Sequence, residues 1–379
     1  MTFFGSDTFE RRRAAACKFL AANHLRAVII GPGPEFEYLT GTQIDTHERL
    51  SAIVLTDEGN ATVVLPSTDA GSFPSDDPAL IPIGWRDGED PYEIVYKLIA
   101  SPADSATPPI VGLGSTLTAD HVLALQRYPF KTCLAQDALS SLFMVKDDDE
   151  IAQLAQAAEA IDRVHALVPS LLTPGITERA VADALHTAIM EEHTAVDFII
   201  VGSGPNGANP HHDFSDRIIE AGDIVVVDIG GTIASGYHSD CTRTYLVEGA
   251  PGCQEQLDAY EVLLQAQQAA CDAARPGMRA EELDAVARNI ISEHGYGEWF
   301  THRIGHGIGL AGHEPPFLVT GNDLVLDEGM VFSIEPGIYK PDSWGMRIED
   351  IVHLQADGAH ALNTRPKTLQ PHPRDTPRI

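Results

Sequence analysis

Five residues in the C-terminal half of this chain have side chains that bind divalent metal ions. Four are carboxylates and one is an imidazole, and they occur in the order Asp228, Asp240, His306, Glu335 and Glu349. Two divalent ions about 3.5 Å apart need carboxylates that bridge them, because the carboxylate charges offset the repulsion between the cations. The set therefore predicts a centre with two metal ions.

The local sequence around the two aspartates favours a pair of adjacent strands. Asp228 closes the apolar run 224–227, and a carboxylate near a core needs a cation or several donors. The alternative is that Asp228 caps a turn at the end of a strand. Asp240 follows 12 residues later, and the glycines between them indicate a turn. We therefore expect a hairpin that brings the two aspartates together.

His306 lies between two glycines, which let the backbone approach a crowded centre. A histidine in a glycine-rich turn is weak evidence alone, but His302 and His313 make a cluster of three. Glu335 and Glu349 follow apolar runs and are predicted to face inward from strands. Arg347 shares a face with Glu349 and is expected to pair with a carboxylate or with the carboxyl end of a substrate; a structural salt bridge is the alternative.

This ordered set resembles the pita-bread metallopeptidases, the superfamily of methionine aminopeptidase and the Xaa-Pro peptidases. The resemblance covers roughly residues 145–360 strongly. Residues 9–145 resemble, more weakly, the N-terminal domain of the Xaa-Pro branch and of creatinase, through segments 27–30 and 36–41. The resemblance implies an α+β chain with two domains. A smaller creatinase-like α/β domain (1–145) precedes a pita-bread catalytic domain (146–379), in which helices cover a pseudo-twofold antiparallel sheet.

The resemblance also implies a role for each site residue. Asp228 would bind one ion, His306 and Glu335 the other, and Asp240 and Glu349 would bridge. Catalytic roles fall on His211, His302 and Glu335, and substrate-binding roles on His313 and Arg347. The expected cofactor is two divalent ions per chain, with manganese ahead of cobalt, zinc and iron.

The function implied is hydrolysis of the peptide bond before proline at a peptide N-terminus, by an Xaa-Pro dipeptidase or aminopeptidase acting on small proline-containing peptides. A homodimer is expected. The alternatives are a metal-independent creatinase-type amidinohydrolase and a non-catalytic binding protein on the same fold; relatives of both lack the ligand set. His212 competes with His211 for the catalytic role.

One position departs from the prolidase pattern. Where this chain has Phe317, prolidases often carry an arginine that clamps the carboxylate of a dipeptide. Arg347 or Arg303 could substitute, or longer peptides could be accepted. The choice between a dipeptide and a longer substrate therefore stays open at this point.

Composition excludes other classes of partner. The chain has 25 Lys and Arg against 55 Asp and Glu, a formal net charge of -30, which argues against nucleic acid and anionic membranes. Five scattered cysteines without C-x-x-C spacing predict free thiols and a cytoplasmic protein. No segment approaches ~20 uninterrupted apolar residues. Residues 202–207 match G-x-G-x-x-G, but the prolines that follow do not open a helix, so we expect no nucleotide site.

The remaining pattern predicts the elements that hold the site. In the N-terminal part, helices are expected at 10–22, 92–100 and 119–127, strands at 27–30, 52–55, 61–65 and 110–113, and a loop at 66–91. An acidic run at 147–150 opens a long helical pattern at 151–172. Pro174-Gly175 and Pro276-Gly277 each precede a helix, which indicates a faint internal repeat.

Overall fold

The computed structural model describes residues 3–45, 48–73, 77, 79–100 and 107–369. The chain divides into two compact units, Met1–Phe143 and Met144–Ile379. All five cysteines are free thiols. Within the described ranges, no helix has both the length and the apolar character needed to cross a membrane.

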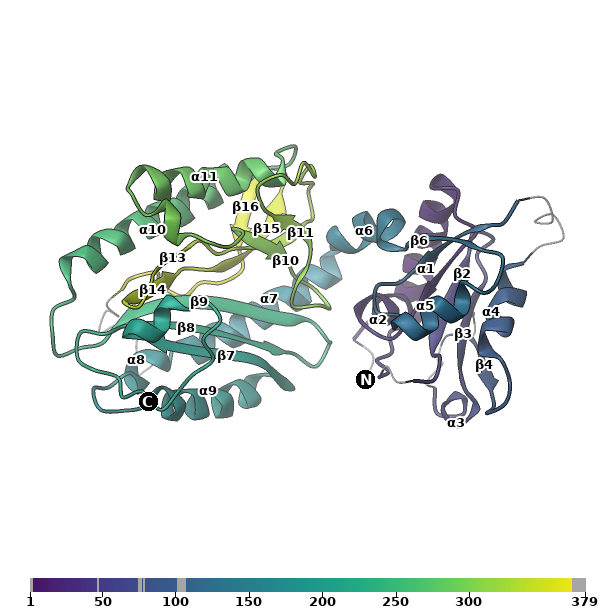
Figure 1. Ribbon diagram of the computed structural model, residues 1–379, viewed down its shortest axis with the longest axis horizontal. Helices are drawn as coiled ribbons and strands as arrows, with labels where there is room; N and C mark the ends of the chain where they lie inside the picture. The colour runs from purple at the N-terminus through teal and green to yellow at the C-terminus, as the bar shows by residue number, and fades with distance from the viewer. Residues whose placement is uncertain (1–2, 46–47, 74–76, 78, 101–106, 370–379) are drawn as a thin grey trace. The chain divides into compact units, whose positions relative to one another are not determined.

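The first unit is an α/β domain around one mixed sheet, in the order β4-β3-β2-β1-β5-β6 (Figure 1). Its strands are β1 (Ala27–Ile30), β2 (Ala52–Thr56), β3 (Ala61–Pro66), β4 (Ile81–Trp85), β5 (Ile110–Leu113) and β6 (Lys131–Leu134). Its helices are α1 (Ser6–Ala22), α2 (Pro34–Thr40), α3 (Ser67–Ala70), α4 (Pro91–Ile99), α5 (Ala119–Leu125) and α6 (Gln136–Met144). The predicted α/β character is confirmed.

The expected loop at 66–91 is wrong in two places, since it contains α3 and β4. Pro82 and Gly84 within β4 disfavour a strand by composition. Because β4 lies at the edge of its sheet, one side of its backbone needs no partner strand, and proline is tolerated there. Residues 74–76 and 78 of the expected loop lie outside the described residues.

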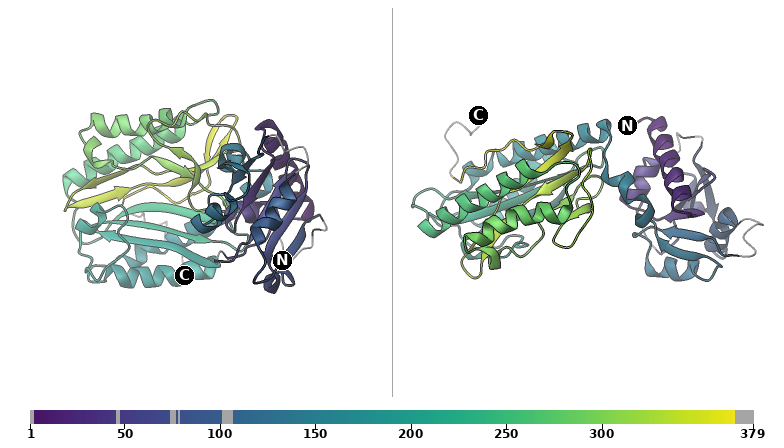
Figure 2. Two further views of the ribbon diagram at one scale, coloured as in Figure 1. Left: turned by 45° about the vertical axis from the view of Figure 1, so that its right-hand side comes forward. Right: turned by 90° about the horizontal axis from the view of Figure 1, so that it is seen from above.

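The second unit has two halves, each made of strands and a pair of long helices. In the first half, the sheet β7-β8-β9 (Ala195–Ser203, Ile224–Thr232, His238–Leu246) packs with α7 (Asp148–His165), α8 (Val168–Leu171) and α9 (Glu178–Glu192). In the second half, α10 (Gln254–Ala273) and α11 (Ala280–Glu293) pack with the remaining strands. Figure 1 shows the two groups, and Figure 2 shows them from two other sides.

The strands of the second half are β10 (Gly305–Gly307), β11 (Glu314–Leu318), β12 (Val331–Ile334), β13 (Gly337–Lys340), β14 (Trp344–Arg347), β15 (Asp350–Gln355) and β16 (Gly358–Ala361). They form a sheet in the order β11-β10-β12-β15-β16 and the pair β13-β14. Short 3₁₀ turns lie at Gly204–Ala208 and Gly297–Trp299.

The internal repeat is visible in how each second helix begins. Thr177, the N-cap of α9, bridges Ile218, and Arg279, the N-cap of α11, bridges Val325. Equivalent helix starts are thus tied to equivalent connections in both halves. The acidic run does open α7, where Asp147 and Glu150 form a reciprocal capping box. That cap begins the helix at Asp148, three residues earlier than the apolar pattern indicates.

Candidate active site

The predicted hairpin is present as β8 and β9. Asp228 pairs with Thr242 and Gly230 pairs with Asp240, so the two aspartates are diagonal neighbours across the ladder. Both are buried, at 8% and 4% exposure. A side chain at Gly230 would meet Phe198 at 2.5 Å, which explains glycine at that position. The hairpin therefore delivers two carboxylates to one buried point.

The other three candidates reach the same point from the second half of the unit. His306 lies in β10, Glu335 follows β12, and Glu349 lies between β14 and β15. The glycines beside His306 are required: a Cβ at Gly305 would lie 1.9 Å from the Ser333 carbonyl oxygen, and one at Gly307 would lie 2.2 Å from that of Pro315. Strand β10 can therefore enter between β11 and β12 only with glycines on either side of the histidine.

The possible ligand atoms form three overlapping groups, in each of which all atoms lie within 4.8 Å of one another. The groups are Asp228, Asp240 and Glu349; His306, Glu335 and Glu349; and Asp240, His306 and His313. Nε2 of His306 is 3.6 Å from Asp240 and 3.3 Å from Glu335. Asp240, His306 and Glu349 each belong to two groups, and of these three only the two carboxylates have the two oxygens with which a side chain can bridge a pair of ions.

The donor set fits divalent cations. Oδ1 of Asp228 and Oε1 of Glu349 are buried and have no hydrogen-bond donor within the described part of the chain. Nδ1 of His306 is 3.1 Å from the Gly307 carbonyl, so it carries the hydrogen and leaves the Nε2 lone pair facing carboxylates. Lone pairs aimed at one another repel unless a cation lies between them.

The close approach of the carboxyl groups also shifts their pKa values. Burial, together with the charges of the neighbouring carboxylates, raises the pKa of Asp240 and of Glu349 well above their usual range. Burial also raises the pKa of Glu335 to about 7, although the Arg347 charge opposes the shift. Burial lowers the pKa of His306 to about 3, which favours the neutral imidazole that can bind a metal.

Arg347 is buried and each nitrogen of its guanidinium has an acceptor in the protein. It forms an ion pair with Asp228 and donates to the Thr242 hydroxyl (3.0 Å), the Tyr339 hydroxyl (2.7 Å) and the Pro210 carbonyl (3.3 Å). The sequence allowed Arg347 to pair with a carboxylate of the protein or with that of a substrate, and the structure shows the ion pair with Asp228. The role of Arg347 in binding substrate stays a prediction.

His302 joins this network through Tyr339. Its Nε2 lies 2.9 Å from the Tyr339 hydroxyl and its Nδ1 lies 2.7 Å from the Arg303 carbonyl. Because Nδ1 must donate to the carbonyl, Nε2 accepts from the hydroxyl. Burial and the Arg347 charge lower the pKa of His302 to about 3. His302 thus helps to orient Tyr339 and, through it, Arg347; its catalytic role remains a prediction.

Three supporting residues escaped the sequence analysis. The Thr242 hydroxyl donates to Glu349 (2.8 Å), and the Ser333 hydroxyl donates to Glu335 (3.2 Å) and accepts from the His306 backbone (3.0 Å). Tyr339 is the third. Thr242 and Ser333 are each two residues from a predicted ligand in a strand, so they share its face. A search for polar residues two positions from a predicted ligand would have found Thr242 and Ser333. The sequence near Tyr339 has no such spacing that indicates its role.

The two histidines of the 209–213 loop differ in their surroundings. His211 is exposed and lines the cavity in front of the carboxylates. His212 instead binds the fully buried Glu178, with Nε2 2.9 Å from Oε2. Glu178 also accepts from the backbone and hydroxyl groups of Ser203 and Ser215, and from Asn206. One buried carboxylate therefore holds both ends of the loop that carries His211.

Replacing Glu178 with alanine is expected to destabilise the protein by about 3–5 kcal/mol, since buried donors lose their acceptor. Urea unfolding measures this loss, with Glu191→Ala, on the exposed face of α9, as the control. A change in the free energy of unfolding of Glu178→Ala no larger than that of the control would contradict the role of Glu178.

Burial raises the pKa of Glu178, but hydrogen bonds from Ser203, Ser215 and His212 outweigh the effect of burial and lower the pKa. The stabilisation from the charge is therefore full above the unfolded-state pKa and lost as pH falls below it.

The carboxylates lie at the wall of a cavity of about 650 Å³. Its lining comprises Phe198, Ile200, Pro210, His211, Asp213, Asp228, Asp240, His302, Arg303, His306, His313, Glu335, Arg347 and Glu349. The nine residues to which the sequence analysis gave a metal-binding, catalytic or substrate-binding role are all in this set. The volume is in the range of small-molecule sites.

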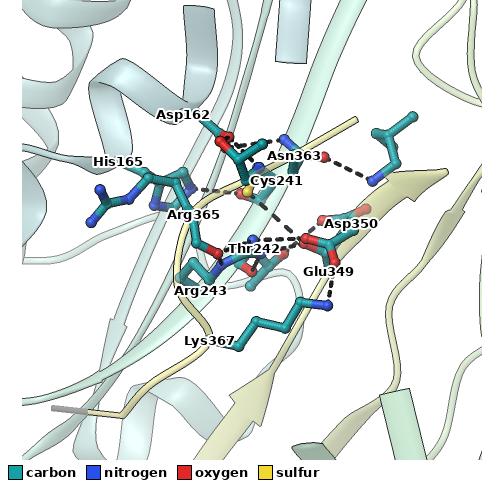
Figure 3. A network of polar contacts seen from close by, with 12 residues as sticks. Asp162, His165, Cys241, Thr242, Arg243, Glu349, Asp350, Asn363, Arg365 and Lys367 are labelled. Carbon is teal, nitrogen blue, oxygen red and sulfur yellow. Dashed lines mark hydrogen bonds and ion pairs between the residues drawn. The ribbon is translucent and has the colours of Figure 1, made fainter. Parts of the chain in front are cut away.

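Behind the ligand strands lies a buried polar network (Figure 3). Arg243 forms an ion pair with Asp350 (2.7 Å) and donates to the carbonyls of Glu349 and Arg365. Cys241 packs in the apolar core of the first half, on the opposite face of β9 from Asp240. Cys241 and Asp350 face away from the carboxylate cluster, because successive side chains of a strand point to opposite faces of the sheet. The contact of Arg243 with the Glu349 carbonyl holds the backbone of Glu349 in place.

Residues 202–207 have a structural explanation. The segment enters a 3₁₀ turn rather than an α-helix. A Cβ at Gly345 would lie 1.7 Å from the Gly207 carbonyl oxygen, so the turn packs directly on β14. The glycine spacing serves backbone packing.

Comparison with known proteins identifies the family. The model of metallopeptidase family M24 matches residues 152–356, and that of the creatinase/prolidase N-terminal domain matches residues 12–133. The chain is 46% identical over 371 residues to a probable dipeptidase PepE of Mycobacterium tuberculosis, covering 97% of each. It is 34% identical over 360 residues to an Xaa-Pro dipeptidase of Pyrococcus furiosus, covering 93% of this chain and 97% of that protein.

The crystal structure of dipeptidase PepE from Mycobacterium ulcerans superposes with a TM-score of 0.92 at 46% identity, covering 97% of this chain and 98% of that one. The two-domain fold and the resemblance seen in the sequence are thereby confirmed. The chain belongs to metallopeptidase family M24 and carries a creatinase/prolidase N-terminal domain.

Proposed function

We propose that this chain is an Xaa-Pro dipeptidase that uses two divalent metal ions. The observation that supports the proposal is the pair of ligand groups that share Glu349, one of which contains Asp240, at the wall of the cavity. Asp228 would hold one ion, and His306 and Glu335 the other. When bound, the ions would lower the pKa of a water molecule and polarise the scissile carbonyl.

The chain's own groups would handle protons and orient the substrate. Glu335, whose side chain is the most exposed of the four carboxylates grouped here, would take up and return a proton at its free oxygen. His211 would donate to the substrate carbonyl or pass a proton to the leaving proline nitrogen. Phe198, Ile200 and Pro210 give the cavity an apolar wall that suits a proline ring.

Proline specificity is supported by the relatives named Xaa-Pro dipeptidase, at 33–35% identity, while the relatives at 36% and 46% are named only dipeptidase. Manganese as the metal and a homodimer as the assembly belong to the same proposal. Metal analysis and light scattering test them.

We expect the metal-loaded protein to cleave Ala-Pro at least tenfold faster, in kcat/KM, than Ala-Leu, and not to cleave peptides with a blocked N-terminus. The physical reason is that a proline nitrogen carries no hydrogen and its ring fills an apolar wall. Release of free alanine measures both rates. Equal values of kcat/KM on Ala-Pro and Ala-Leu would contradict the proposed proline specificity. Hydrolysis of creatine by the metal-free protein would favour the creatinase-type alternative.

A further inference from the structure

Residues 363–369 form a segment, which we call the strap, that runs through the buried polar network behind the ligand strands (Figure 3). The strap contains no helix or strand, yet Asn363 and Leu369 within it are buried. Buried backbone groups that no helix or strand satisfies need other hydrogen-bond partners. The strap is therefore held in place by contacts with the elements around it.

The first half of the second unit binds the strap from α7 and from β9. In α7, Asp162 accepts from the Asn363 side chain (3.2 Å) and from both the backbone and the hydroxyl of Thr364, the latter at 2.9 Å. In β9, the Arg243 guanidinium donates to the Arg365 carbonyl (2.8 Å). The strap is thus bound to the half of the unit that contains the β8–β9 hairpin.

The second half of the unit binds the strap from α10 and from β15. Lys367 forms an ion pair with Asp350, the first residue of β15, and donates to Gln267 of α10 (2.8 Å). The backbone N–H of Ile351 donates to the side-chain oxygen of Asn363 (2.8 Å). The strap therefore connects the two halves of the unit through hydrogen bonds and an ion pair.

The candidate metal ligands are divided between the same two halves. The first half carries Asp228 and Asp240, and the second carries His306, Glu335 and Glu349. Two of the three groups of possible ligands combine residues from both halves. Distances between a metal ion and its ligands must be correct within about 0.2 Å. A small shift of one half against the other would therefore weaken the binding of the ions.

Glu349 is the ligand that the strap reaches most directly. Asp350 follows it in the chain and is fully buried, in ion pairs with Arg243 and Lys367. Arg243 also donates to the Glu349 carbonyl. Because a buried carboxylate is stable only beside cations or several donors, these two cations hold Asp350 in one position. The backbone of Glu349 is held with it.

We propose that the strap holds the two ligand-bearing halves in the register that two metal ions require, with Lys367 and Asp162 as positioning residues. Lys367 fixes Asp350 beside Glu349, and Asp162 ties the same strap to α7. The inference rests on the proposed two-metal centre. It adds a coupling: docking of the strap and binding of the ions favour the same arrangement of the halves, so each strengthens the other by the same factor.

Lys367→Met is the variant that tests the role of the strap. The Lys367 side chain is 22% exposed, and Arg243 still pairs with Asp350 after the substitution, so the protein should fold. Arg243 is unsuitable, because its removal would deprive the buried Asp350 of its buried cation. Loss of a group that supports a metal ligand weakens metal affinity by about 10–100-fold, so we expect the manganese dissociation constant of Lys367→Met to rise about tenfold. Lys367→Arg should recover most of this loss, because it restores the cation.

Lys340→Met is the matched control. It removes the ion pair of a partly exposed lysine with Glu255 of α10 (2.6 Å), but this pair lies within the second half of the unit. Urea unfolding of the metal-free proteins should show a similar loss of stability in both variants, whereas only Lys367→Met should bind manganese more weakly. An equal rise of the dissociation constant in Lys340→Met would show that metal affinity follows general stability, and would overturn the positioning role of Lys367.

Hydrogen exchange on the wild type tests the coupling without a variant. The backbone N–H of Thr364 donates to Asp162, so it exchanges when the strap leaves α7. Manganese should slow this exchange by about tenfold or more, because the ions and the docked strap stabilise each other. The N–H of Tyr92 donates to Asp90 in the first unit (2.9 Å) and should exchange at the same rate with and without manganese.

Either of two further results would overturn the inference and leave the proposed function standing. One is a folded Lys367→Met protein that binds manganese as tightly as the wild type does. The other is an exchange rate of the Thr364 N–H that manganese does not change, in a wild type that binds the ion. A wild type that binds no divalent ion would overturn the proposed function, and the role of the strap with it.

Discussion

Asp240→Ala is expected to lose at least one of two bound divalent ions and at least a thousandfold in kcat/KM. Asp240 is 4% exposed and belongs to both an aspartate-containing group and a histidine-containing group of possible ligands. Removing it takes away a negative charge shared by two cations, and their repulsion is then less compensated. Metal content per chain, measured on the dialysed protein, checks the loss directly.

The matched control for Asp240 is Asp213, a carboxylate that lines the same cavity but is exposed and belongs to none of the ligand groups. Asp213→Ala should keep both ions. Far-ultraviolet circular dichroism separates a local loss of metal from misfolding. Two ions retained in a folded Asp240→Ala protein would exclude Asp240 as a bridging ligand.

His211→Ala should keep both ions and lose about a hundredfold or more in kcat, the range for one lost donor or proton carrier. His211 lines the cavity but stands outside the three ligand groups. His212 is engaged by the buried Glu178. His212→Ala should therefore lower the free energy of unfolding while it changes kcat much less than His211→Ala does.

The pair of variants separates the two histidines. A loss of kcat confined to His212→Ala would show that the resemblance assigned the catalytic role to the wrong histidine. No loss in either variant would remove the loop from the mechanism. Loss of metal in His211→Ala would make His211 a ligand rather than a proton carrier.

The sequence predicted the parts of the site whose side chains follow from strand periodicity. Asp228 and Asp240 were expected to meet through a hairpin, and the ladder brings them together as diagonal neighbours. Cys241 and Asp350 each follow a candidate ligand directly in the chain, and both lie in the buried layer behind the site because neighbours in a strand point to opposite faces. The glycines beside His306 were expected to allow a close approach, and the neighbouring carbonyls leave no room for a side chain.

What the sequence left open depends on contacts between distant segments. Nothing near Glu178 or His212 indicates that they pair, since 34 residues separate them. The same holds for Arg347 and Asp228, which are 119 residues apart, so the sequence could not choose between a carboxylate of the protein and one of the substrate. Strand β4 was missed because its proline is acceptable only at a sheet edge, a position that the topology decides.

The number of divalent ions per chain tests the central claim most directly. The protein is stripped with a chelator, dialysed, and titrated with manganese while bound metal and Ala-Pro hydrolysis are measured on the same samples. The arrangement of Asp228, Asp240, His306, Glu335 and Glu349 predicts that two ions bind per chain, that the stripped protein is inactive, and that activity returns as both sites fill. Full peptidase activity in protein that holds no metal would contradict the account.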